Sequence, residues 1–251
     1  LIQAKVASTN GAILRLGVNW VNQDTIEVAA GGTLNLDGTW ENQGTILVTD
    51  AATTLGGNFT TAGYGDFQRS GGTVKIDGVL DNTSDSLVLD ANTGSWELAS
   101  GGTSLGGTVE PGLAGSALTY TAGTLDGVTM NADMDLSEPV SISITLRNGL
   151  TLNGTALMGD EGTRFGRFVI NGAQTLDGTG EIVLGDASTT SGIALSTNGD
   201  LVVEAGLTIR GGSGTSGASN HSLVMKAPVT AEIANEQIYI RGDSLTLLAP
   251  A

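Results

Sequence analysis

Carboxylates at turn positions are the residues of this sequence that come closest to a catalytic pattern. Asp37 and Asp77 each precede a glycine, and Asp126 and Asp177 share the phrase Leu-Asp-Gly. A glycosidase needs two carboxyl groups about 5–9.5 Å apart, and neighbouring coils of a repeat fold can supply that separation. Asp-Gly is also a favoured turn pair. Turn chemistry alone therefore explains all four carboxylates.

The other requirements of catalysis are missing from the pattern. A polysaccharide lyase would need basic side chains beside its acidic ones, but the seven arginines are dispersed and only Arg164 and Arg167 lie close together. His221 is the single histidine and has no Gly-x-Ser-x-Gly motif with it. The chain has no cysteine, and a zinc site draws on several His or Cys ligands. We predict no catalytic, cofactor or metal residue and expect that the protein is not an enzyme.

Two further groups of residues suggest ligand binding. Tyr64, Phe67 and Arg69 fall where the repeat described below loosens, so an aromatic pair and a guanidinium on a loop could hold a sugar ring. The alternative is a turn whose aromatic rings fold back onto the protein. Calcium is a weaker possibility. It rests on carboxylates that cluster around one turn and would supply hard oxygen ligands: Asp81, Asp85 and Asp90.

Net charge excludes several classes of partner. The chain has 26 acidic and 10 basic residues, for a formal charge of −16. Nucleic-acid phosphates and anionic membrane surfaces both need lysine and arginine patches, so we expect neither as a partner. No apolar run approaches the roughly 20 residues that span a bilayer, and we expect no membrane insertion.

The elements that position these residues come from an internal repeat. The segment 14–28 returns as 34–48, with identical residues at more than half of the positions. Each copy holds two short alternating runs, rich in Leu, Thr, Ile and Val, between Asp, Gly and Asn residues. Runs of about 3–5 residues are too short for helices and are typical of strands. A period of 20 leaves no room for a crossover helix, so we predict a parallel β-helix.

In-register stacking makes specific predictions about the interior. Trp20, Trp40 and Leu80 should form one internal stack, with Phe59 filling the intervening turn after a one-residue slip. A side-chain amide ladder should run along one bend, built from Asn22, Asn42 and Asn82. A stack of hairpins or a sandwich is the structural alternative, but neither needs a fixed period of 20.

The repeat pattern extends through the chain in looser form. The units 150–154 and 168–172 repeat the strand-plus-turn phrase at a slightly shorter spacing, Ser137-Glu138-Pro139 suggests a bend, and the Gly/Ser-rich segment 211–220 suggests a loop. We predict an all-β fold, a single right-handed parallel β-helix over residues 1–251. It should have about 12 turns of about 20 residues at the ~4.7–4.9 Å strand spacing. The handedness follows from the general preference of parallel crossovers.

The phrases at residues 32–40, 121–127 and 150–155 resemble the repeats of large bacterial secreted or surface β-helix proteins, such as filamentous haemagglutinins and autotransporter passengers. The resemblance covers most of the chain and lies in pattern and composition. It implies an extracellular or cell-surface location and a non-catalytic structural or adhesive rod, here an excerpt of a longer protein. The implied partners are glycans or cell-surface molecules, and the coil ends could self-associate end to end. A carbohydrate-binding or polysaccharide-cleaving β-helix is the alternative.

Overall fold

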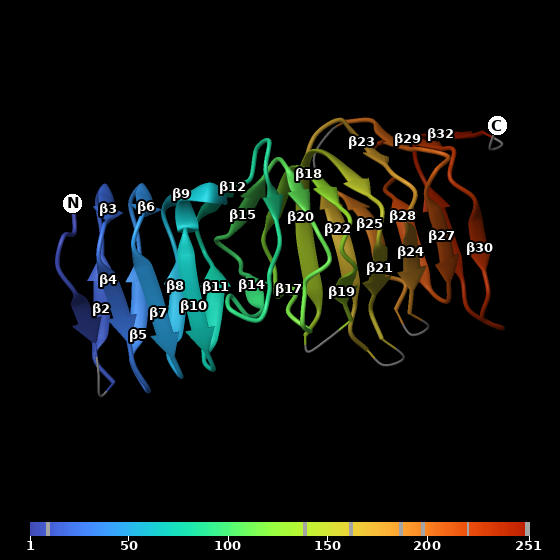
Figure 1. The fold of residues 1–251 in the computed structure, drawn as a ribbon. Helices are drawn as coiled ribbons and strands as arrows, with labels where there is room; N and C mark the ends of the chain where they lie inside the picture. The colour runs from blue at the N-terminus through green and yellow to red at the C-terminus, as the bar shows by residue number, and fades with distance from the viewer. Residues whose placement is uncertain are drawn as a thin grey trace. The chain divides into compact units, whose positions relative to one another are not determined.

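The structure is a computed structural model that describes residues 1–8, 11–137, 140–160, 163–185, 188–196, 199–219 and 221–248. The chain divides into two compact units, Leu1–Thr119 and Tyr120–Ala251. Each unit is a parallel β-solenoid, in which successive coils place their strands side by side (Figure 1). This confirms the predicted fold class.

The first unit stacks its strands in three columns around one interior. The first column contains β1 (Val6–Ser8), β4 (Thr25–Val28), β7 (Thr45–Thr49) and β10 (Asp66–Ser70). The second contains β2 (Ile13–Leu16), β5 (Thr33–Leu36), β8 (Ala52–Leu55), β11 (Thr73–Ile76), β14 (Trp96–Leu98) and β17 (Leu118–Tyr120). The third contains β3 (Trp20–Asn22), β6 (Trp40–Asn42), β9 (Asn58–Thr60), β12 (Val79–Asp81) and β15 (Thr103–Leu105). A further pair is β13 (Ser86–Leu87) with β16 (Thr108–Val109), and the 3-10 turn η1 (Ala62–Tyr64) follows β9.

The predicted aromatic stack is present. The Trp20 and Trp40 rings lie 5.3 Å apart and 2° from parallel, and the Phe59 ring follows at 4.5 Å and 14°. Leu80 is the strand partner of Phe59 in the next coil. Each indole N–H donates to a carbonyl inside the coil, Trp20 to Asp37 and Trp40 to Gly56. The stack therefore fills the interior without leaving a buried donor unpaired.

The asparagine ladder is present over its first step and then changes. Asn22 Nδ2 donates to Asn42 Oδ1 at 2.8 Å, and Asn42 Nδ2 donates to the carbonyl oxygens of Tyr64 and Asp66. Asn82 is also buried, but its Oδ1 accepts from Thr61 Oγ1 at 2.6 Å. The coil between Asn42 and Asn82 thus supplies a hydroxyl where an amide ladder would need a third asparagine.

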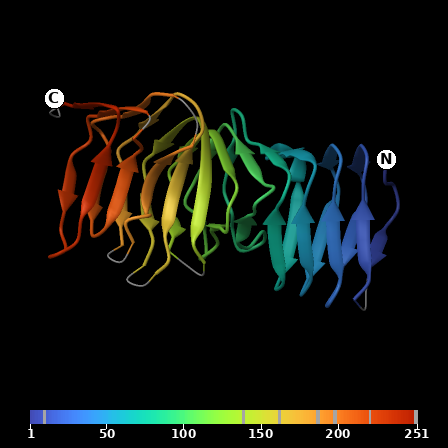
Figure 2. The same ribbon diagram turned by 180° about the vertical axis from the view of Figure 1, so that it is seen from behind.

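The second unit has the same architecture with longer coils, and Figure 2 shows its strands from behind. One column contains β18 (Thr124–Met130), β20 (Ile142–Leu152), β22 (Gly166–Ile170), β25 (Gly192–Leu195), β28 (Gly214–Gly217) and β31 (Ile238–Arg241). A second continues from β20 through β23 (Gln174–Asp177), β26 (Leu201–Val203), β29 (Ser222–Met225) and β32 (Ser244–Leu247). The third contains β19 (Met134–Leu136), β21 (Thr155–Met158), β24 (Glu181–Leu184), β27 (Thr208–Gly211) and β30 (Val229–Ala231).

The predicted period holds only for the first coils. Ile26 lies opposite Val6 on one side and Ile46 on the other, so the first coils keep the offset of the sequence repeat. In the second unit Thr208 lies opposite Glu181, which is a longer interval along the chain. The chain therefore makes about 10 turns of about 22 residues, fewer and longer than predicted. Part of the added length lies in the strands, since β18 and β20 have 7 and 11 residues, and the rest lies in the corners.

Two local predictions have separate outcomes. The segment 211–220 is not a loop as predicted, because its residues 214–217 form β28 and Ser213 and Ser216 are buried. Small side chains there fill a narrow interior, which composition alone cannot distinguish from a linker. The predicted bend at Ser137-Glu138-Pro139 lies partly outside the described residues, since these do not include Glu138 and Pro139.

One corner of the first unit requires glycine for steric reasons. Gly38 has φ +80, and a Cβ there would lie 1.6 Å from the carbonyl oxygen of Val18 in the preceding coil. Val18 occupies the matching position one coil earlier with φ +60 and is 82% exposed. A β-branched residue at positive φ is strained, so Val18 keeps a conformation that favours glycine.

Opposite substitutions at this corner should have opposite effects on stability. We expect Gly38→Ala to lower the free energy of unfolding by about 3 kcal/mol, because both strain and overlap cost roughly 1–3 kcal/mol. We expect Val18→Gly to raise it by about 1 kcal/mol, because the strain is removed. Urea denaturation measures both, with Gly17→Ala as the control, since a Cβ at Gly17 meets nothing within 4 Å. A neutral Gly38→Ala variant would contradict the coil spacing.

Replacement of the buried Asn42 should also lower the stability of the fold. Asn42→Leu keeps the volume roughly constant but removes the amide donor of the Tyr64 and Asp66 carbonyls, while the Asn22 amide keeps its bond to the Asp24 carbonyl. Unpaired buried groups cost about 1–3 kcal/mol each, so we expect a loss of about 3 kcal/mol in urea denaturation. Asn35→Leu, on the outer face of β5, is the matched control and should change stability by less than about 0.5 kcal/mol.

Candidate functional site

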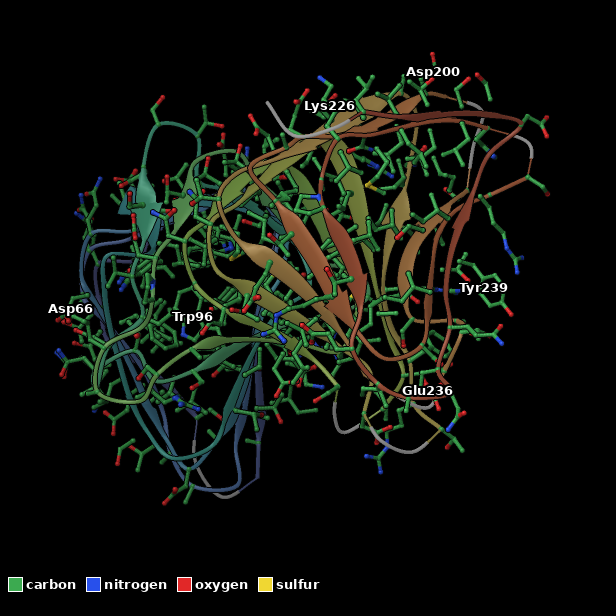
Figure 3. The ribbon with its side chains drawn as sticks, turned by 90° about the vertical axis from the view of Figure 1, so that its right-hand side faces the viewer. Asp66, Trp96, Asp200, Lys226, Glu236 and Tyr239 are labelled. Carbon is green, nitrogen blue, oxygen red and sulfur yellow. The ribbon has the colours of Figure 1, made fainter. Side chains whose placement is uncertain are left out.

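The predicted sugar-binding segment is built differently from a surface loop. Tyr64 ends η1, and Phe67 and Arg69 belong to strand β10. Phe67 is only 2% exposed, so its ring is not available as a sugar platform. The rings of Tyr64 and Phe67 both make T-shaped contacts with the Trp96 ring, with centroids 5.1 and 5.6 Å apart. Figure 3 shows Trp96 enclosed by the coils, while Asp66 lies at the outer surface. The aromatic residues therefore fold back onto the core, as in the alternative interpretation.

Arg69 is also used internally. Its Nη1 donates to the Gly72 carbonyl at 2.8 Å, and its Nε is buried without a hydrogen-bond partner. The guanidinium lies so close to Gly94 that a Cβ on that glycine would be 1.9 Å from Nη2. Of the three predicted residues, Tyr64 has a half-buried ring, and Arg69 has a half-buried side chain that packs on its own coil at Gly72 and on the next coil at Gly94. A ligand contact by this segment stays a prediction.

The carboxylates of the acidic turn, Asp81, Asp85 and Asp90, accept hydrogen bonds from nearby backbone N–H groups. Oδ1 of Asp81 accepts the N–H of Thr83, Oδ1 of Asp85 accepts that of Ser86, and Asp90 accepts two such bonds from Asn92 and Thr93. These hydrogen bonds hold the pKa of Asp81 and of Asp90 below the usual aspartate value. Among the residues that the structure describes, no three His, Cys, Asp or Glu side chains gather closely enough to hold a metal ion.

The aspartates of the Asp-Gly turns lie in different coils and have structural contacts. Asp126 Oδ1 accepts from Asn148 Nδ2 at 2.5 Å, Asp177 accepts the N–H of Gly178, and Asp77 accepts that of Gly101. The fourth, Asp37, lies beside Gly56 of the next coil, where a Cβ would be 2.5 Å from its Oδ1. Stabilisation of turns accounts for all of these positions.

The arginine pair and the single histidine singled out in the sequence each have separate contacts. Arg164 pairs with Asp160 at 3.1 Å, while Arg167 donates to Ser143 Oγ and lies over the Phe165 ring. His221 is half-buried, and both of its ring nitrogens lack a hydrogen-bond partner within the described part of the chain. Asp243 lies beside His221, since its N–H donates to the His221 carbonyl, but within the described residues no group of three metal-ligating side chains includes this histidine.

A polar groove of about 440 Å³ crosses the third column of the second unit. Thr155 N–H donates to Asp133 at 2.7 Å, and Arg210 donates two hydrogen bonds to Glu181. Arg210 lowers the pKa of the Glu181 carboxyl, mainly by these hydrogen bonds. A general acid needs a raised pKa, so Glu181 is not prepared for that role. Ion pairing between coils is common on this unit, and Lys226, at the surface in Figure 3, pairs with Glu204 at 2.7 Å.

A groove of about 540 Å³ lies on the outer face of β3, β6 and η1 in the first unit. Strand alternation turns the residues between Trp and Asn outward here, which are Val21 in β3 and Glu41 in β6. The groove is lined by Leu1, Asn19, Trp20, Val21, Thr39, Trp40, Glu41, Thr60, Ala62 and Gly63. It combines a carboxylate, an amide and hydroxyl groups with aliphatic side chains, and it borders the two buried tryptophans.

Sequence reasoning missed this groove although its signal was present. The repeated phrase Trp-x-Asn fixes the parity of β3 and β6, so its middle residue had to face outward next to the aromatic stack. The wall is supplied by η1, and no periodic pattern predicted that insertion.

Comparisons with family models, curated proteins and solved structures find no match to this chain. Within the described residues, no helix has the length and apolar character needed to cross a membrane.

Two tyrosines should make stability depend on alkaline pH. Burial raises the pKa of Tyr64, with a further contribution from Asp90 and Asp85, and burial alone strongly raises that of Tyr120. The folded protein therefore keeps protons that the unfolded chain releases above pH ~10. We expect stability to be full below pH ~10 and to fall above it by about 1.4 kcal/mol per pH unit for each protonated tyrosine.

Urea midpoints between pH 8 and 11.5 measure this dependence. Tyr64→Phe and Tyr120→Phe should each flatten the decline, because phenylalanine has no proton to lose. An unchanged decline in the double variant would show that other groups cause it.

Proposed function

We propose that this chain is a structural and adhesive segment of a bacterial secreted or cell-surface protein, with no catalytic activity. The observation that carries the proposal is the stacking of coils, in which the strands of successive coils pair in parallel ladders. In such a repeat each coil contacts its neighbours alone. Load along the stack is therefore borne by parallel strand ladders and an aliphatic and aromatic interior.

Surface chemistry supports the same proposal. The net charge of −16 keeps a repetitive β-protein soluble, and the basic residues Lys5, Lys75 and Lys226 are paired with glutamates of a neighbouring coil. The partners we propose are glycans or other cell-surface molecules. The alternative, a polysaccharide-cleaving β-helix, would need a carboxyl pair with divided acid and base roles.

End-to-end self-association belongs to the same proposal. In the described residues, β31 and β32 have no strand on their outer edge, and Leu245 and Leu247 are 40% and 61% exposed. An unpaired edge is a template for another strand. Light scattering should detect concentration-dependent oligomers that Leu247→Lys reduces, whereas a monomer at high concentration would contradict this part.

A mechanical experiment tests the load-bearing role. With the chain held at its two ends in a single-molecule force measurement, we expect unfolding in successive steps. Each step should release one coil of about 22 residues, which corresponds to about 70–80 Å of extended chain. Gly38→Ala should remove steps from the first unit, whereas Gly17→Ala should not. Collapse of the whole chain in one event at negligible force would contradict the proposal.

A further inference from the structure

We propose that the groove on β3, β6 and η1 is a binding site for a neutral saccharide. This inference rests on the adhesive part of the proposed function and names the ligand and its site. The groove belongs wholly to the first unit, and no residue that lines it is one of the three predicted from sequence. Tyr64 is adjacent, because it ends the same turn η1 whose Ala62 and Gly63 line the groove.

The groove has a defined shape. Its floor is the outward face of β3 and β6, and η1 forms one wall, which is held in place where Gly63 N–H donates to Thr60 Oγ1 at 2.8 Å. Gly63 has no side chain to fill the space, and a Cβ there would lie 2.7 Å from that hydroxyl oxygen. On the other side, Thr39 N–H donates to Asn19 Oδ1. Hydrogen bonds from backbone N–H groups to side-chain oxygens thus brace both sides of the groove.

The lining alternates apolar and hydrogen-bonding groups. The apolar side chains are Leu1, Val21 and Ala62, and the buried residues Trp20 and Trp40 border them from the inner side of the strands. The polar groups offer donors and acceptors. Asn19 uses its Oδ1 on Thr39, which leaves its amide N–H groups for a ligand, and Glu41 uses one carboxylate oxygen to accept from Gln43 Nε2. A saccharide ring presents both C–H faces and hydroxyl groups, and so matches such a surface.

Charge and strand pairing exclude the other occupants. Among the described residues that line the groove, Glu41 has the only charged side chain, so it would repel a sialylated or uronic-acid ligand, a phosphate or an anionic lipid. An extended peptide normally adds to an unpaired strand edge. Here β3 pairs with β6, and one isolated bridge on each outer side joins Asn22 to Ile2 and Thr39 to Asn58. The floor of the groove is the outward face of this pair and not its edge, so a peptide bound there would not extend the sheet.

The three tryptophans provide an internal test. In ¹H–¹⁵N spectra of the intact chain, we would follow the indole N–H signals during titration with neutral oligosaccharides of glucose, galactose, mannose and N-acetylglucosamine. We expect saturable shifts for Trp20 and Trp40, which border the groove, and none for Trp96, which is fully buried elsewhere. Glu41→Gln should weaken the binding about tenfold, because the carboxylate is a stronger acceptor than an amide.

Asp24→Asn is the matched control, because it removes one exposed acidic charge from the same unit outside the groove. Four outcomes would each overturn the proposal. The Trp20 and Trp40 indole signals could fail to shift with every neutral sugar, or all three indole signals could shift equally. Asp24→Asn could weaken the binding as much as Glu41→Gln does, or the protein could prefer sialylated sugars. These outcomes differ from failure of the proposed function, because the force measurement on the same protein reports load bearing independently of any ligand.

Discussion

In-register stacking of parallel strands is the constraint on which the rest of the structure depends. Each coil must place its backbone about 4.7–4.9 Å from the next. A side chain at a corner position must therefore avoid the carbonyl oxygen of the preceding coil. Gly38 meets that carbonyl without a side chain, and the equivalent Gly57 does so one coil later. The same spacing brings identical side chains into contact, which turns Trp20 and Trp40 into a stack and Asn22 and Asn42 into a hydrogen-bonded pair.

The parts of the fold that follow from repetition could be predicted from the sequence. The parallel solenoid, the Trp20–Trp40–Phe59 stack and the slip in register before Phe59 all follow from strand periodicity and the regular offset of the repeat. The longer coils of the second unit could not be predicted in this way, because residues added at a corner leave the inward rows unchanged. The prediction of a loop at 211–220 was wrong for a related reason. Glycine and serine there line an interior that narrows, and composition does not distinguish a small-residue strand from a loop.

The candidate site was less predictable, because ligand binding depends on which way each side chain points. Once β10 pairs with β7, Phe67 becomes the partner of Ile46 and shares its inward direction. The loosened register suggested a loop, but the chain returned to a strand directly after the short turn η1. A single shift of parity moved Phe67 from the predicted surface to the core.

The insertion that removed the predicted site also produced the groove. A coil without η1 would pass from β9 to β10 through a short corner, and the outward faces of β3 and β6 would be open and flat. With η1 present, Ala62 and Gly63 rise beside Thr60 and Glu41 and enclose a concave surface. The side of η1 that carries Tyr64 meets Trp96 instead, which fixes the wall to the core through an aromatic contact. One short irregularity in a regular stack therefore creates a shaped surface and anchors it, while the strand ladders on both sides remain continuous.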